Sequence, residues 1–157
     1  MSISLQKGQK VSLTKENAGL SSVLIGLGWD EAKRMRGGFF SPKPQPIDCD
    51  ASALLLRGGR LIEQADIVYF GNLSHKTGTV RHMGDNLTGA GEGDDEQIIV
   101  DLDQLPAEYD RIVIVVNIYE ANQRNQHFGM IENAFIRLVD GKTNQEMCKY
   151  NLSENYT

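Results

Sequence analysis

The stretch Ile47-Asp-Cys-Asp-Ala-Ser-Ala-Leu-Leu55 places an apolar residue at every odd position. Asp48, Asp50 and Ser52 lie at even positions between them. Successive side chains of a β-strand point to opposite faces, so this period of two predicts a strand with one face in the core. The turn Arg57-Gly-Gly-Arg60 follows and is expected to end the strand.

The same alternation recurs along the chain in short segments, for example in Val23–Trp29. Short strands between turn residues are typical of a β-sandwich, so we predict an all-β fold. We expect two mostly antiparallel sheets with a few short helices. One helix is predicted around Glu120–Phe128, with Gly129 placed to end it. The other predicted strands are Ile3–Leu5, Val11–Leu13, Ile67–Phe70, Thr79–His82, Gln97–Val100, Ile112–Val116, Ala134–Val139 and Glu146–Tyr150.

The composition is that of an ordinary globular domain, with 157 residues, 40% of them hydrophobic and 24% charged. We therefore expect a single domain over residues 1–157. Three of the four prolines lie in residues 36–46, which we interpret as a loop of that domain rather than a linker. Cys49 and Cys148 are far apart in the sequence and are expected to be reduced thiols in the core.

Charge and hydropathy exclude two classes of protein. The chain carries 21 Asp and Glu against 16 Lys and Arg, for a formal net charge of -5, so no direct nucleic-acid binding is expected. The longest apolar run, Ile112–Val116, is too short to span a membrane, and the N-terminus has no apolar run of signal-peptide length. These features predict a cytoplasmic protein with no transmembrane segment.

The acidity is concentrated in one segment. Residues 85–103 hold seven Asp and Glu and no Lys or Arg, and without them the chain has 14 acids against 16 bases. Within this segment, Gly84-Asp-Asn-Leu-Thr-Gly-Ala-Gly-Glu-Gly-Asp-Asp-Glu96 interleaves four glycines with its acids. Carboxylate, amide and carbonyl oxygens are the donors that Ca²⁺ takes, and the stretch has no Cys or His for Zn²⁺ or Cu.

Three other interpretations of this segment are a solvated acidic loop, an EF-hand loop and a phosphate cradle. Acids splayed into water need no cation, so a solvated acidic loop stays an alternative to a calcium site. Asp85–Glu96 has the twelve-residue length of an EF-hand loop, but Leu87 and Gly89 occupy its third and fifth positions, so it is not an EF-hand. A phosphate cradle is disfavoured because the stretch has no Lys.

Other oxygen donors are predicted to lie near this segment. Asp48 and Asp50 are two apart on one strand, so both point away from the Cys49 face. Asp30 ends the predicted strand that contains Trp29, and Asn72 follows another. Loops at one end of a sandwich come together, so these residues could complete a metal site, although Asp and Asn are also common turn formers.

Several of these motifs together resemble the TerD family, the tellurite-resistance and general stress proteins of bacteria. The match covers nearly the whole chain. The motifs that carry it are Ser4–Gly8, Val11–Lys15, Gly26-Leu-Gly-Trp-Asp30, Ile47-Asp-Cys-Asp-Ala-Ser52, Gly84–Glu96, and Phe128-Gly129 with Asn133-Ala-Phe-Ile-Arg137.

The resemblance implies a single TerD-like domain that binds two Ca²⁺ ions. It also implies a role in resistance to tellurite and other stresses. It also suggests other tellurite-resistance proteins as partners. Carried over by position, the metal ligands implied by the resemblance are Asp30, Asp48, Asp50, Asn72, Asp85, Asn86, Asp94, Asp95 and Glu96.

The chain departs from the family pattern at its C-terminal end. Family members continue past Asn151–Glu154 into further strands, whereas this sequence stops at Thr157, so the domain is expected to lack those strands. A sheet edge or core face left uncovered would favour self-association or a partner strand. A heat-stable, monodisperse monomer in sedimentation would contradict that expectation.

Three classes of function follow from the sequence. We expect a calcium-binding stress-response protein that acts as a binding, assembly or sensing module, and not an enzyme. The alternative is a module that uses bound Ca²⁺ to bridge to anionic ligands or lipid. A metal-dependent hydrolase ranks last, because no nucleophile is paired with a base. The three histidines, His75, His82 and His127, are scattered and are expected to be structural or on the surface.

Overall fold

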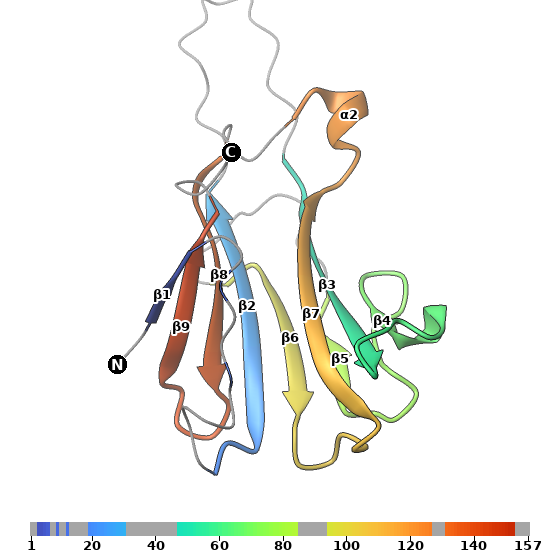
Figure 1. The fold of residues 1–157 in the computed structure, drawn as a ribbon. Helices are drawn as coiled ribbons and strands as arrows, with labels where there is room; N and C mark the ends of the chain where they lie inside the picture. The colour runs from blue at the N-terminus through green and yellow to red at the C-terminus, as the bar shows by residue number, and fades with distance from the viewer. Residues whose placement is uncertain are drawn as a thin grey trace, which may run out of the picture.

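The computed structural model describes residues 3–6, 9, 12, 19–30, 47–84, 94–126 and 131–152 as two β-sheets with almost no helix, shown in Figure 1. All strand pairs are antiparallel except the parallel pair formed by the first and last strands. The predicted all-β, two-sheet class is therefore confirmed. The six-stranded sheet contains β1 (Ile3–Leu5), β2 (Ser22–Asp30), β5 (Val80–His82), β6 (Glu96–Asp101), β8 (Glu132–Asp140) and β9 (Glu146–Asn151), and the three-stranded sheet contains β3 (Cys49–Arg57), β4 (Ile67–Val68) and β7 (Tyr109–Ile118).

Strand order explains which parts of the chain meet. The larger sheet runs β1-β9-β8-β2-β6-β5 and the smaller one β4-β3-β7. The C-terminal ends of β2 and β5 lie at the same end of the sandwich as the start of β6, because both strands are antiparallel to β6. The start of β3 lies at this end as well (Figure 1). The C-terminal ends of β2 and β5 and the starts of β3 and β6 therefore lie at the same end of the sandwich.

The core lies between the sheets and matches the period-two pattern. The odd-numbered apolar residues of β2 and β3 are buried, including Leu27, Cys49 and Leu55 at 1% or less exposure. Both cysteines are buried free thiols, as the sequence predicted. No helix in the described part of the chain reaches the length and apolarity needed to cross a bilayer.

The helical prediction needs correction. The only α-helix among the described residues is α2 (Ala121–Arg124), a single turn, accompanied elsewhere by the 3-10 turn η1 (Gln64–Asp66). Asn125 adopts a left-handed conformation with φ 51° and ends α2, four residues before the predicted stop at Gly129. Asn is one of the few residues besides glycine that accepts this conformation readily. Gly129 lies outside the described residues, and so do Val11 and Leu13 of the predicted Val11–Leu13 strand, whose central residue Ser12 is described and not assigned to a strand.

A buried polar network anchors the long excursion between β3 and β5. Asp66 is fully buried and accepts hydrogen bonds from the Tyr109 hydroxyl (2.9 Å) and from Arg57 (2.9 Å). His75 Nε2 lies 2.8 Å from Asp66 Oδ1, and His75 Nδ1 lies 2.8 Å from the Thr77 hydroxyl. This one carboxylate therefore connects the end of β3, the loop that contains His75 and the start of β7.

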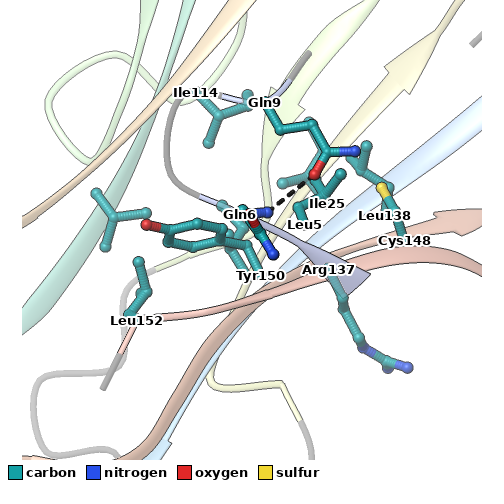
Figure 2. A pocket seen from close by; sticks show the side chains of 12 residues that line it. Leu5, Gln6, Gln9, Ile25, Ile114, Arg137, Leu138, Cys148, Tyr150 and Leu152 are labelled. Carbon is teal, nitrogen blue, oxygen red and sulfur yellow. Dashed lines mark hydrogen bonds between the residues drawn. The ribbon is translucent and has the colours of Figure 1, made fainter. Parts of the chain in front are cut away.

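A cavity of about 360 Å³ opens between β7 and the β8–β9–β1 side of the larger sheet. Figure 2 shows its lining, with Ile114 on one side and Leu138 and Cys148 on the other. β7 pairs with β3 along one edge, and within the described ranges no strand pairs with its other edge. The cavity is therefore lined by apolar side chains from both sheets, and self-association stays a prediction.

Candidate metal centre

Three carboxylates meet inside the protein at the end of the sandwich where β3 and β6 begin. Asp48, Asp50 and Glu96 are 6%, 3% and 2% exposed, and each offers an oxygen within 4.8 Å of the others. Asp48 and Asp50 come from the β3 segment, and Glu96 is the first residue of β6. The structure thus brings together three of the nine residues predicted as ligands, from both sheets.

Glu96 reaches from the larger sheet to the smaller one. Its Oε2 accepts a hydrogen bond from the Ala51 backbone N–H at 3.0 Å. β4 pairs with β3 only at Ala53 and Leu54, so the Ala51 amide lies beyond the end of β4, and the carboxylate takes the place of a strand carbonyl. The Tyr119 N–H donates to the Asp48 carbonyl at 2.8 Å and fixes the backbone on the other side.

The electrostatics of this cluster favour a cation. Two carboxylates about 5 Å apart repel by roughly 3 kcal/mol at an effective dielectric near 20, and three of them form three such pairs. Burial and the neighbouring Asp48 and Glu96 raise the pKa of the Cys49 thiol, so the thiolate that a soft metal would need is disfavoured. The centre therefore offers hard oxygen donors, which suit Ca²⁺.

Asp94, which the sequence suggested as a metal ligand, is paired with an arginine in the structure. Arg137 of β8 donates to both of its oxygens, from Nε and Nη2, at 2.8 Å each. The Gln97 amide donates to the same carboxylate at 3.2 Å. Asp94 is thus held by a bidentate pair on the larger sheet, and its prediction as a metal ligand remains untested.

Gly26 makes this pairing possible. It lies in register with Arg137 on β8 and with Gln97 on β6, and a Cβ atom there would come within 2.5 Å of the Asp94 carboxylate. The sequence pattern places Gly26 between buried Ile25 and Leu27, but gives no sign of what fills the space above it. Glycine at this point is required by the close approach of a side chain rather than by its backbone angles.

Replacing Gly26 with alanine is therefore expected to destabilise the fold. Overpacking of this kind costs about 1–3 kcal/mol, or several degrees in the melting temperature of a chain of this size. Differential scanning fluorimetry on Gly26→Ala, Asp94→Ala and the double variant measures the effect. Because the clash needs both groups, the double variant should lose less than the sum of the single ones. Strict additivity would contradict this interpretation.

The other predicted ligands that the structure describes have partners of their own. Asp95 Oδ2 accepts the Trp29 N–H at 2.9 Å, and burial, Asp30 and Asp94 raise the pKa of its carboxyl. Asp30 is exposed at the end of β2 and accepts a hydrogen bond from Asn133 at 2.6 Å. The Asn72 amide donates to the Ile67 carbonyl at 2.8 Å within a turn, the structural role also considered for it. Asp85 and Asn86 lie outside the described residues.

Sequence reasoning assigned no role at this site to His82, the last residue of β5. It is 4% exposed, and its Nε2 lies 3.4 Å from Glu96 Oε2. The Gly84 backbone N–H donates to its Nδ1 at 3.1 Å. Its position in the strand pair with β6, which brings it near Glu96, was not visible in the spacing of the histidines.

The fold and this site together define a class: a two-sheet β-sandwich with a buried carboxylate cluster at one end. The TerD domain model matches residues 1–157, and the chain belongs to this family of tellurite-resistance and stress-response proteins.

Curated relatives and a solved structure agree with this assignment. The chain is 54% identical to stress response protein SCP2 of Bacillus subtilis (strain 168), over 99% of this chain and 80% of that protein. It is 43% identical to tellurium resistance protein TerD of Serratia marcescens, over 99% and 77%. A crystal structure of a homologue of telluride resistance protein (TerD) from Streptomyces coelicolor A3(2) covers 83% of this chain and 71% of its own, with TM-score 0.64 and 24% identity, which supports the fold alone.

Proposed function

We propose that this protein is a calcium-binding module of the bacterial stress response, of the tellurite-resistance type, and not a catalyst. The observation that carries the proposal is the buried cluster of Asp48, Asp50 and Glu96, with oxygens within 4.8 Å of one another. Buried carboxylates in such proximity are stabilised by a cation. The family names of the relatives support the stress-response part of the proposal.

The donor set fits calcium. Ca²⁺ takes six to eight oxygens at about 2.3–2.6 Å, more than three carboxylates usually supply. Asp48, Asp50 and Glu96 would hold the first ion, and Asp30 and Asp95 lie at the same end of β2 and β6 to supply further donors. Asp85 and Asn86 belong to the acidic segment that precedes β6. The family resemblance implies a second ion, which would use Asp85 and Asn86.

Burial also argues for a binding role over a catalytic one. At 2–6% exposure, the three carboxylates have room to contact an ion but little surface to offer a substrate. An ion held between β3 and β6 would join the two sheets, so its binding would change the stability of the whole sandwich. That coupling is the property that a sensing or assembly module needs.

Chelation tests the proposal. A ligand present at one hundred times its dissociation constant stabilises the folded state by about 2.7 kcal/mol, which for this length corresponds to roughly 5–11 °C. We expect the melting temperature to fall by this order when excess calcium is replaced by EDTA, and calorimetry to record calcium binding. An unchanged melting curve together with no heat of binding would refute the proposal.

A second candidate function is favoured by a specific surface. Four large apolar side chains around the centre, those of Phe70, Leu73, Met83 and Tyr119, are 39–57% exposed. Backbone hydrogen bonds connect three of them to residues of the centre or their neighbours. The Leu73 carbonyl accepts the His82 N–H, the Met83 N–H donates to Gln97, and the Tyr119 N–H donates to Asp48. Exposed apolar side chains beside a cation site suit an anionic amphiphile, whose headgroup would contact Ca²⁺. These rim residues are Phe70, Leu73, Met83 and Tyr119.

Vesicle flotation tests this candidate. We expect binding to vesicles of phosphatidylserine and phosphatidylcholine in calcium, and none in EDTA or on phosphatidylcholine alone. Met83→Ala, which removes the most exposed rim side chain at 57%, should weaken it several-fold without changing the melting temperature by more than about 1 °C. Binding that is absent, or that persists in EDTA, would remove this candidate and leave the calcium proposal intact.

A further inference from the structure

We propose that His82 is a positioning residue of the candidate metal centre, which holds the Glu96 carboxylate in the orientation an ion needs. The inference rests on the proposed calcium function. His82 and Glu96 come from adjacent strands of the larger sheet, and their side chains are both fully buried, with Nε2 3.4 Å from Oε2.

The hydrogen bond on the far side of the ring determines its chemistry. The Gly84 N–H donates to His82 Nδ1 at 3.1 Å, so Nδ1 acts as the acceptor and carries no proton. In a neutral imidazole the proton then lies on Nε2, the nitrogen that faces Glu96. His82 therefore presents an N–H group to the carboxylate, and neither nitrogen has a lone pair to offer a metal.

Glu96 Oε2 accepts one hydrogen bond and lies next to His82. The Ala51 N–H donates to Oε2 at 3.0 Å from the smaller sheet, and His82 faces the same oxygen from the larger sheet. His82 Nε2 lies 3.4 Å from Oε2 and forms no hydrogen bond with the described residues, so its effect on the carboxylate is an electrostatic attraction inside the protein. This attraction and the Ala51 hydrogen bond together restrain rotation of the carboxylate, which sets the direction of Oε1 relative to Asp48 and Asp50. Residues that orient metal ligands in this way contribute to affinity without touching the ion.

The same ring also connects the centre to the acidic segment. Gly84 has φ +117°, a conformation that side-chain-bearing residues rarely adopt, and Asp85 follows it directly. Its N–H is the group bonded to Nδ1. His82 thus contacts both Gly84, the residue before the acidic segment, and Glu96, the first residue of β6.

Two matched substitutions separate this role from a general effect of burial. His82→Asn keeps a polar atom near the position of Nδ1 but does not reach Glu96, whereas His82→Gln places an amide N–H₂ near the position of Nε2. We expect calcium affinity, measured by titration calorimetry, to fall about 10- to 100-fold in His82→Asn and to stay within a few-fold of wild type in His82→Gln. His75→Gln, which alters the Asp66 network instead, should lower the melting temperature and leave calcium affinity unchanged.

Terbium luminescence distinguishes a positioning residue from a ligand. Its lifetimes in H₂O and D₂O count the water molecules bound to the ion, and this number should be the same in wild type and His82→Asn. An additional water in the variant would make His82 a ligand and overturn the proposal. Equal losses of affinity in His82→Asn and His82→Gln would also overturn it, since the donor would then not matter.

The outcomes also separate this inference from the calcium proposal. If wild type binds calcium and His82→Asn binds it equally well, the positioning role is wrong and the calcium function stands. If wild type binds no calcium, both fail. Circular dichroism and melting curves in EDTA establish that each variant folds at the titration temperature, and His82→Gln supplies the comparison if His82→Asn does not fold.

Discussion

Glu96→Gln is expected to change calcium affinity and calcium-free stability in opposite directions. The substitution keeps the shape of the side chain and an oxygen for the Ala51 N–H, but removes one of three buried charges. Calcium affinity should fall at least about 100-fold, or about 2.7 kcal/mol. In EDTA the variant should melt no lower than wild type, because each carboxylate pair that it removes costs roughly 3 kcal/mol at an effective dielectric near 20.

The comparison needs a control with the same chemical change. Glu108→Gln serves, since its side chain is 56% exposed and contacts Arg57 at the other end of β3. It should leave both calcium affinity and the melting temperature close to wild type, as surface charge changes generally do. A dissociation constant for Glu96→Gln within about threefold of wild type would remove Glu96 from the centre.

Asp66→Asn is expected to produce the largest loss of stability, with no effect on calcium. Asp66 is fully buried and connects Arg57, His75 and Tyr109. Breaking a buried charge pair of this kind costs about 3–5 kcal/mol, or about 10 °C in a protein of this length. Urea denaturation in EDTA measures the loss, and calorimetry at a permissive temperature should find the calcium affinity of wild type. A loss below about 1 kcal/mol would contradict the anchoring role.

The same network predicts a pH dependence. Burial acts to raise the pKa of Asp66, but hydrogen bonds from His75, Arg57 and Tyr109 outweigh it and lower the pKa from 3.8 to about 2. A carboxyl whose pKa is depressed in the folded state stabilises that state above its unfolded pKa, and the contribution is lost as pH falls from about 4 to 2. The stability difference between wild type and Asp66→Asn in EDTA should shrink over that range. A constant difference would argue against this linkage.

Much of the fold could be predicted from the sequence, because one face of each long strand is buried. The alternation in Val23–Trp29 and Ile47–Leu55 depends only on that burial. The first segment lies within β2 and the second forms β3 from Cys49 onward, both with their apolar faces in the core. Short elements were predicted less well. The strand expected at Ile67–Phe70 contains only Ile67 and Val68, because Tyr69 and Asn72 pair with each other to form a turn.

The candidate site was predictable in its chemistry but not in its pairing. Clustered acids indicated oxygen donors, and the alternation along β3 placed Asp48 and Asp50 on one side. The choice of Arg137 as partner of Asp94 depends on the register between β2 and β8, which local sequence does not encode. His82 was missed for the same reason, since its approach to Glu96 follows from the pairing of β5 with β6.

The central claim is that Asp48, Asp50 and Glu96 hold a calcium ion between the two sheets. A crystal structure of the wild-type protein grown with saturating calcium tests it most directly. The account predicts an ion with carboxylate oxygens of all three residues at about 2.3–2.6 Å. Calcium bound elsewhere, or no ion among these three side chains at saturating calcium, would contradict it.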